Sequence, residues 1–339
     1  MPDRGAEQRV QGCRLRLPPG LGGAFWMATL LLALAELALH SETVMFQYRA
    51  VFAVGRAYDK LFEVERRPPP VLFIGNSRTD NGIDPQTVDR VGLHARPGFN
   101  LGLPGANAIV YQGEIRRLDD RKLLGKTAIH TAVFGLDESA LQEDNSLGYI
   151  SFLADRRALW DAGRYRDWLA SLLRLWSYSG NLRELREPDK ALRFVEASVR
   201  SLDPVGGAAA AYRGYRAGFG AAQNAGQVAQ QESVALHPPA PAVEHFLWQA
   251  IDLLQARGVR VFVTLPPLRD RPSAFVDPRP EATPYRALLD QLRQRGVVVL
   301  PVPTGFTPDD FINAGHLNDR GAQRYSAELG RQLATWQDR

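Results

Sequence analysis

The sequence predicts an α/β fold in which helices cover both faces of a parallel β-sheet, preceded by one transmembrane helix. Short apolar runs that end in glycine or polar turns alternate with helical segments of about 10–15 residues, a pattern typical of parallel sheets. The first run, Val71–Ile74, is wholly apolar and stops at Gly75, as expected for a central strand. Near the N-terminus, a longer apolar segment has the length of a membrane span.

The apolar segment Leu21–Leu39 contains 19 residues and one charged side chain, Glu36. At about 1.5 Å per residue, a helix of this length spans about 28 Å, close to the hydrocarbon core of a bilayer. Four arginines precede it, so the positive-inside rule places residues 1–20 in the cytoplasm and the main domain outside, in the periplasm of a bacterium. We therefore expect a single-pass inner-membrane protein with its anchor at residues 21–40. A cleaved signal peptide and a soluble core helix are the alternatives, but no clean small-residue cleavage site follows the run.

Composition excludes several classes of function. The 339-residue chain has a formal net charge of +4 with acidic and basic residues interspersed, which gives no support to nucleic-acid binding. Its single cysteine, Cys13, precedes the apolar segment, so the outer domain has no disulfide framework. The histidines lack metal-ligand spacing, and we predict no metal and no cofactor.

Residues 41–70 are expected to form a helical stalk that ends at Pro68–Pro70, because consecutive prolines cannot continue a helix. Residues 71–339 then form the globular domain. Its expected strands are Val71–Ile74, Phe99–Leu101, Thr127–Phe134, Val259–Leu265 and Val297–Val302. Its expected helices are Pro85–Val91 after an Asp84 N-cap, Ala106–Leu118, Ala242–Arg257, Thr283–Arg295 and Asp319–Trp336.

A largely helical insertion at about 139–241 interrupts the alternation. Tryptophan and leucine at helical spacing predict that most of its apolar side chains belong to the core. The Ala/Gly/Gln-rich stretch Val205–Gln231 predicts a mobile loop or a weak helix. Because the insertion follows the third strand, it lies on the side of the expected site and is a candidate lid or substrate groove.

Polar or glycine-rich turns at four positions after strands point to one site, because the carboxyl ends of parallel strands meet at one edge of the sheet. Ser77 is a candidate nucleophile and His316 a candidate base, while backbone N–H groups of Ser77 and Gly105 are candidate oxyanion donors. A turn serine and a helix-capping histidine are the structural alternatives. Thr79 stands where the α/β-hydrolase nucleophile elbow has its last glycine, so that motif is absent.

These blocks resemble the SGNH/GDSL hydrolase superfamily. Ser77 stands in Gly-Asn-Ser-Arg, Gly105 in Asn-Leu-Gly-Leu-Pro-Gly-Ala and His316 in Gly-His-Leu-Asn-Asp-Arg-Gly, and the match covers Val71 to Trp336 apart from the insertion. The resemblance implies a flavodoxin-like three-layer sandwich with a serine nucleophile and a histidine base. The anchor followed by an outward domain is also similar to exported proteins that add or remove O-acetyl groups on bacterial polysaccharides, such as the alginate O-acetylation proteins.

Two positions depart from the family pattern. Asp137 stands in the third block, where the family usually has an asparagine that donates to the oxyanion, and an ionised carboxylate cannot donate. Asn313 stands three residues before His316, where the family has aspartate, and Asp310 is a possible replacement for orienting the imidazole. Arg78 directly follows the serine and is a candidate for holding an anionic substrate, or one half of a surface ion pair.

The leading hypothesis is a membrane-anchored extracytoplasmic enzyme that hydrolyses or transfers O-acyl groups, chiefly acetyl, on cell-surface carbohydrate. Expected partners are a carbohydrate or acyl-ester substrate, the membrane and other polysaccharide-modification proteins. Asp137 and Asn313 motivate the alternative, an inactive SGNH-like domain that binds polysaccharide or scaffolds envelope proteins. A third hypothesis is an esterase for lipids or peptidoglycan.

Overall fold

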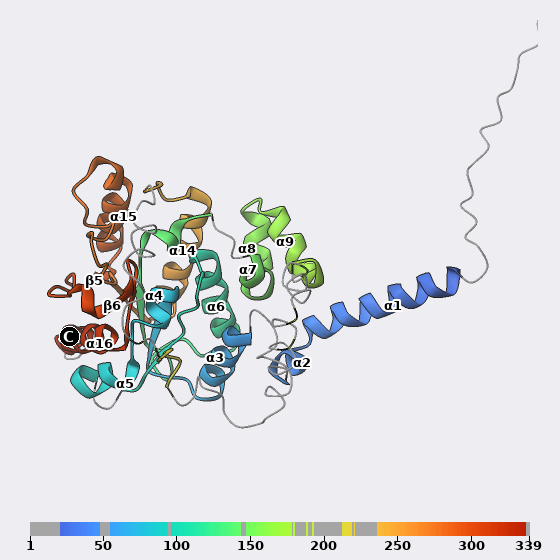
Figure 1. The fold of residues 1–339 in the computed structure, drawn as a ribbon, viewed down its shortest axis with the longest axis horizontal. Coiled ribbons are helices and arrows are strands. Elements are labelled where there is room, and N and C mark those ends of the chain that lie inside the picture. Colours follow the sequence, from blue (N-terminus) through green and yellow to red (C-terminus); the bar gives the residue numbers. More distant parts are fainter. Residues whose placement is uncertain are drawn as a thin grey trace, which may run out of the picture.

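A computed structural model describes residues 21–47, 55–93, 96–143, 147–177, 212–218 and 236–336, and the single positions 179, 188, 192 and 220. The fold is α/β, and its centre is a five-stranded parallel sheet with the strand order β2-β1-β3-β4-β5 (Figure 1). The strands are β1 (Val71–Gly75), β2 (Gly98–Asn100), β3 (Thr131–Gly135), β4 (Arg260–Thr264) and β5 (Val298–Val299). The predicted cytoplasmic residues 1–20 lie outside the described part.

Strand β1 lies inside the sheet, between β2 and β3, as its uniform apolar sequence predicts. Its first residue, Val71, pairs with Gly98 of β2 on one side and Thr131 of β3 on the other, and the whole strand is buried. Strand β3 begins four residues later than the predicted Thr127, after a loop in which Gly125 has a φ of +124°.

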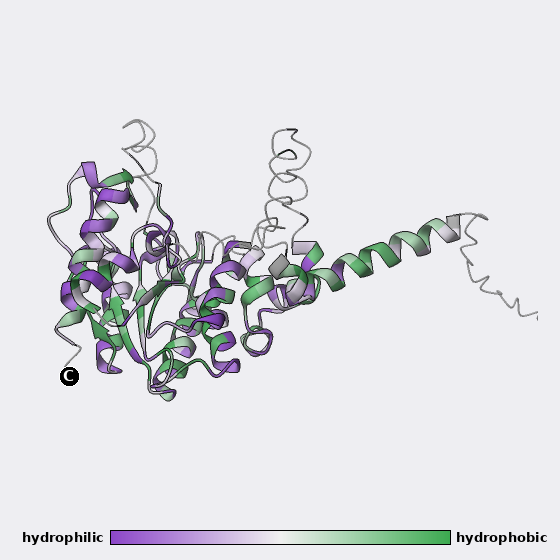
Figure 2. Cartoon of the chain, turned by 90° about the horizontal axis from the view of Figure 1, so that it is seen from below, coloured by the Kyte–Doolittle hydropathy of each residue, from purple (hydrophilic) through white to green (hydrophobic). Residues whose placement is uncertain are grey.

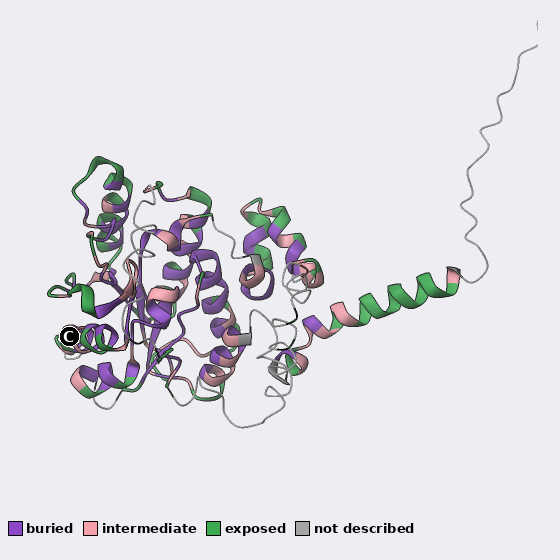
Figure 3. Cartoon of the chain, viewed as in Figure 1, coloured by how far each residue is buried: buried purple, intermediate pink, exposed green. Residues whose placement is uncertain are grey.

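Alternate side chains of β1 enter two separate apolar clusters, as the two-residue period of a strand requires. Leu72 and Ile74 pack in a cluster with α6 (Ala108–Asp120), α14 (Pro241–Ala256) and α15 (Thr283–Gln294). Val71 and Phe73 pack in a second cluster with α5 (Pro85–Val88) and α16 (Asp319–Ala334). In Figure 3, purple marks buried residues, and it covers much of the sheet and of the helices around it.

The segment after β1 differs from its prediction. A short helix, α4 (Ser77–Asp80), begins at Ser77 itself, where the sequence predicts a turn. The predicted Asp84 cap is present and accepts a hydrogen bond from the Gln86 N–H at 3.0 Å. Helix α5 then continues as a π-turn, Asp89–Leu93, which extends the predicted helix by two residues.

The N-terminal helix α1 (Leu21–His40) is apolar, exposed and long enough to cross a membrane (Figures 2 and 3). After it come α2 (Glu42–Gln47) and α3 (Gly55–Arg66), and residues 48–54 lie outside the described part. Helix α3 is not a free-standing stalk, because Tyr58, Leu61 and Val64 are buried in the same cluster as α6. The N-terminal region therefore joins the globular core before the first strand.

The described part of the insertion is largely helical up to residue 177, whereas residues 212–218 and 236–240 are not helical. It contains a 3₁₀ turn at Glu138–Leu141, α7 (Leu147–Leu153), α8 (Arg156–Asp161) and α9 (Tyr165–Leu172). Trp168 packs against the core, but Trp160 and Trp176 are about half exposed, contrary to the expectation that this stripe is mostly core. Most of the predicted loop Val205–Gln231 lies outside the described residues.

The remaining elements lie in the C-terminal third of the chain. They are the 3₁₀ turns Pro280–Ala282 and Pro308–Asp310 and an antiparallel hairpin, β6 (Phe311–Asn313) and β7 (His316–Leu317). The hairpin, which the sequence did not predict, carries His316.

Candidate functional site

Ser77 lies just after the carboxyl end of β1. Asn76 caps α4, and its side-chain oxygen accepts the Arg78 N–H at 2.9 Å. Glycine is required just before it, because a Cβ on Gly75 would lie 2.0 Å from Thr79 Oγ1. Helix α4 therefore folds tightly against the strand end and holds the half-buried Ser77 hydroxyl at the edge of the sheet.

The hairpin β6–β7 brings His316 to Ser77. Ser77 Oγ and His316 Nε2 lie 2.8 Å apart, although 239 positions separate them in sequence. On the other side of the ring, His316 Nδ1 lies 2.9 Å from Asn313 Oδ1. The three side chains form a hydrogen-bonded series in the order hydroxyl, imidazole, amide.

Asn313 also determines the tautomer of His316. The same Asn313 oxygen accepts the backbone N–H groups of Gly315 at 3.0 Å and His316 at 2.9 Å. These two donors identify that atom as oxygen, which can only accept. The proton of a neutral imidazole therefore sits on Nδ1, and Nε2 presents its lone pair to Ser77, as a general base requires.

The electrostatic surroundings keep His316 neutral. Burial lowers its pKa below the ordinary value of 6.5, the Arg78 guanidinium lowers it further, and the Asp137 carboxylate opposes both. A neutral imidazole at neutral pH can take the proton of the serine hydroxyl.

Asp310, the second candidate for orienting His316, has other partners. It is fully buried and forms a capping box in which its carboxylate accepts the Thr307 N–H at 2.9 Å. The same carboxylate pairs with Arg324 and, at 3.3 Å, with Arg320. Asp310 thus fixes the loop before the hairpin, and Asn313 is the residue that contacts the imidazole.

Asp137 is held inside the protein by hydrogen bonds. One carboxylate oxygen accepts from Asn76 Nδ2 at 2.7 Å, and the other accepts from the Ser139 N–H at 2.9 Å and the Ser139 hydroxyl at 2.6 Å. These contacts link the first and third strand ends. Asp137 therefore has a structural role here, and the sequence analysis assigned no role to Asn76 or Ser139.

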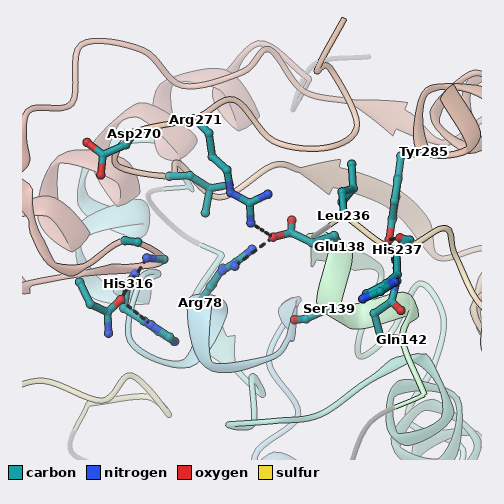
Figure 4. Close-up of a pocket in the computed structure, with 14 residues that line it drawn as sticks. Arg78, Glu138, Ser139, Gln142, Leu236, His237, Asp270, Arg271, Tyr285 and His316 are labelled. Atoms are coloured by element: carbon teal, nitrogen blue, oxygen red, sulfur yellow. Dashed lines mark hydrogen bonds and ion pairs between the residues drawn. The ribbon is translucent and has the colours of Figure 1, made fainter. Parts of the chain in front are cut away.

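A row of alternating charges extends from the serine loop (Figure 4). Arg78 lies 3.3 Å from Asp137 and 3.2 Å from Glu138, and Arg271 donates to Glu138 at 2.5 Å. Burial raises the pKa of Glu138, but the two arginines outweigh that effect and leave it below its ordinary value of 4.5. The charge of Arg78 is thus balanced within the protein, and Arg271 is the more exposed of the two guanidinium groups. Nothing in the sequence around Arg271 signals this role.

A cavity of about 450 Å³ opens beside His316, on the side of the charged row. Most side chains that line it can form hydrogen bonds, among them Glu138, Gln142, Asp270, Arg271 and Tyr285 (Figure 4). Its size suits a small ligand that offers hydroxyl groups to these side chains and apolar faces to the rest of the lining.

The loop that carries Gly105 is fastened to the end of β1. The Leu101 N–H donates to the Phe73 carbonyl at 2.7 Å, and the Leu103 N–H donates to the Gly75 carbonyl at 2.9 Å. Gly105 has a φ of +74°, which favours glycine, and faces open space. This placement at the strand end is compatible with the predicted oxyanion role of its N–H.

Within the described ranges, no group of three or more His, Cys, Asp or Glu side chains is arranged to hold a metal ion. The candidate site thus consists of Ser77, His316 and Asn313 beside a polar cavity. No protein-family model matches this sequence, and no curated protein matches it.

Proposed function

We propose that this protein is a membrane-anchored extracytoplasmic enzyme that hydrolyses or transfers O-acyl groups, chiefly acetyl, on cell-surface carbohydrate. The observation that carries the proposal is the series Ser77 Oγ, His316 and Asn313, with contacts of 2.8 and 2.9 Å. A nucleophile, its base and a third group that orients the base are the parts of a serine acyl-transfer site.

In the proposed reaction, Ser77 Oγ attacks the ester carbonyl while His316 Nε2 takes the hydroxyl proton. The backbone N–H groups of Ser77 and Gly105 stabilise the oxyanion that forms. Collapse of this intermediate breaks the ester bond, leaves the acyl group on Ser77 and passes the proton from His316 to the departing alkoxide. Water then attacks the acyl-serine in an esterase, or a sugar hydroxyl attacks it in a transferase, and His316 takes the proton of the attacking group. The bond between the acyl group and Ser77 then breaks, and His316 returns this proton to Ser77 Oγ.

The polar cavity supports a carbohydrate as the substrate or acceptor. Gln142 Nε2 already donates to the Tyr285 hydroxyl at 2.7 Å and to backbone carbonyls, so these two side chains are held in place. Fixed polar groups of this kind match the hydroxyl groups of a sugar.

The proposal includes the SGNH-like three-layer fold and the location. Apolar clusters on both faces of the sheet support the layers, and the exposed apolar helix α1 supports a single membrane anchor. The arginines before α1 support a cytoplasmic N-terminus and a periplasmic main domain.

The direct test uses the full chain in detergent with p-nitrophenyl acetate as the substrate. We expect Ser77→Ala to lower kcat by about 10³-fold or more, because the nucleophile is lost. A fluorescent serine-directed phosphonate should label the wild type and not the variant. Thr335→Ala, which removes an exposed hydroxyl at the end of α16, should keep full activity. If Ser77→Ala turned over the substrate as fast as the wild type, and the phosphonate did not label the wild type, the proposed enzymatic function would be wrong.

One observation favours the alternative of an inactive, polysaccharide-binding or scaffolding domain. The third strand end supplies the carboxylate of Asp137, and not a side-chain amide, so the proposed oxyanion site has backbone donors only. Absence of labelling together with retention of the chain on an O-acetylated polysaccharide column would establish this alternative. If the enzyme is active, a panel of acetylated sugars, peptidoglycan fragments and lipid esters will separate the substrate classes.

A further inference from the structure

A second cleft, of about 840 Å³, lies where α1 meets the globular domain. It shares no lining residue with the cavity beside His316. Five arginines and three carboxylates line it, so positive charge prevails. The arginines are Arg116, Arg117, Arg121, Arg156 and Arg157.

The cleft is adjacent to the end of the proposed membrane span. Glu42, one of its lining residues, is two positions after His40, the last residue of α1. Arg156, another lining residue, donates to His40 Nδ1 at 3.1 Å. Two residues of chain reach at most about 7 Å. The headgroup layer on each side of a bilayer is about 5–8 Å thick, so a span that ends at His40 places this cleft at the level of the headgroups.

Two of the five arginines, Arg156 and Arg157, have the fewest ionic contacts and are the most available to a ligand. Arg117 and Arg121 are tied to Glu42 and Glu65, and these ion pairs fix α2 and α3 against α6. Arg116 is exposed but lies 3.2 Å from Asp120 and 3.8 Å from Asp155. Arg156 and Arg157 are exposed.

The contacts of these exposed arginines leave donors unused. The two acceptors of Arg156 are uncharged, the His40 ring nitrogen and the Ser171 carbonyl. The side chain of Arg157 is 91% exposed, and its nearest carboxylate, on Asp161, is 3.7 Å away. Guanidinium groups with unused donors bind phosphate oxygens well.

Exposed tryptophans lie on the same part of the molecule. Trp160 shares helix α8 with Arg156 and Arg157 and is 50% exposed. Trp176 is 45% exposed and follows Leu175, whose N–H donates to Glu36 of α1 at 2.9 Å. Tryptophan gathers at the boundary between hydrocarbon and headgroups, so these side chains independently mark this surface as membrane-facing.

We propose that the cleft formed by Arg116, Arg156 and Arg157 binds the phosphate of an anionic phospholipid headgroup. This inference rests on the proposed anchoring of α1 in a membrane, and it does not depend on the ester chemistry. The bound lipid would hold the insertion helices α8 and α9 against the bilayer surface and so fix the domain relative to its anchor.

Native mass spectrometry of the full-length protein in detergent micelles tests the proposal. The protein is titrated with phosphatidylglycerol or with phosphatidylcholine of the same acyl chains. We expect the wild type to retain phosphatidylglycerol at least about tenfold more tightly, since each interfacial arginine contributes roughly fivefold to the affinity. The combined variant Arg116→Gln, Arg156→Gln, Arg157→Gln should lose that preference. Equal binding of both lipids to the wild type overturns the proposal without reference to any variant.

The matched control removes three exposed arginines elsewhere, by Arg293→Gln, Arg295→Gln and Arg331→Gln. This control variant should keep the preference for phosphatidylglycerol. If both triple variants lost the preference equally, the net charge of the protein would explain it, and the proposed binding site would be wrong. If equimolar inorganic phosphate displaced phosphatidylglycerol, the cleft would be a site for free phosphate, and the proposal of a lipid ligand would be wrong. Alkaline carbonate extraction distinguishes the anchoring of α1 from the headgroup site. If α1 is not a membrane anchor, the wild type and the variants are all released from the membrane. If only the headgroup site is wrong, all of them stay in the membrane.

Discussion

At the scale of single residues, the protonation of His316 should control the pH dependence of activity. The base works only when it is neutral, and burial together with Arg78 lowers its pKa below 6.5. A lowered pKa means that the neutral form prevails at a lower pH. We therefore expect kcat/KM for p-nitrophenyl acetate to rise with pH, with a midpoint below 6.5, and to stay flat through neutral pH.

Arg78→Gln removes the positive charge that helps to lower this pKa and leaves Asp137, which raises it. The midpoint of the pH profile should therefore move to higher pH. Arg331→Gln, an exposed change on α16, should leave the midpoint in place. A midpoint that is the same in all three proteins would show that another group limits the rate.

Asn313 and Asp310 should have separable roles. Asn313→Ala removes a hydrogen bond to the imidazole worth about 1 kcal/mol, so kcat should fall about fivefold or more. Asp310→Ala removes the buried carboxylate of the capping box, so the free energy of unfolding should fall by about 1–3 kcal/mol. Steady-state kinetics and urea unfolding of both variants separate the two effects. If Asp310→Ala lowered kcat at unchanged stability, Asp310 would be the orienting residue after all.

At the scale of elements, α3 is attached beneath the site by a buried lysine. Lys60 Nζ lies 2.7 Å from Asp80 Oδ1, on α4, and 2.5 Å from the Gly102 carbonyl, in the loop that leads to Gly105. Burial lowers the pKa of Lys60 to about 8, and Asp80 opposes this shift, so the side chain is charged at pH 7.

Lys60→Met should leave Asp80 and the Gly102 carbonyl without this donor. Arg56 still pairs with Asp80 at 2.7 Å, so the expected cost is that of one lost buried donor, about 1–3 kcal/mol of unfolding free energy. Arg66→Gln, on the same helix, breaks an exposed pair with Glu63 and should cost about 0.5 kcal/mol or less. Urea unfolding in detergent gives both values, and equal costs would mean that Lys60 does not hold α3.

Helix α6 and the insertion approach each other at a glycine. A Cβ on Gly113 would lie 2.1 Å from the Leu153 carbonyl oxygen at the end of α7, so Gly113→Ala must push the backbones apart. We expect a loss of at least about 1 kcal/mol of unfolding free energy. Gly148→Ala, within α7, meets nothing within 4 Å and should stabilise the protein by about 0.5–1 kcal/mol. A neutral Gly113→Ala would indicate that the insertion is loosely attached to α6.

At the scale of the whole molecule, the sequence predicted the five strands of the parallel sheet and named both residues of the Ser77–His316 contact, because these depend on local pattern. Strand β5 is shorter than predicted, with Val298–Val299 in place of Val297–Val302, and the hairpin β6–β7 was not predicted. Val71–Ile74 is apolar and is followed by glycine, and His316 stands in a motif before a capped helix. Contacts between distant segments have no such local signal. The Lys60–Asp80 pair, the Glu138–Arg271 pair and the role of Asn76 each depend on chain segments that meet only after folding. The choice between Asn313 and Asp310 likewise required the hairpin geometry.

The orientation of the chain in the membrane can be tested with its single cysteine. Cys13 precedes α1, and the arginines around it predict that it lies in the cytoplasm. In intact spheroplasts, a membrane-impermeant maleimide should leave Cys13 unlabelled, and a permeant maleimide should label it. In a Cys13→Ser background, Thr335→Cys, at the exposed end of α16, should react with both reagents. The reverse pattern would place Ser77, His316 and Asn313 on the cytoplasmic side, where exported carbohydrate could not be the substrate of the proposed enzyme. Release of the labelled chain by alkaline carbonate would instead show that α1 does not span the membrane.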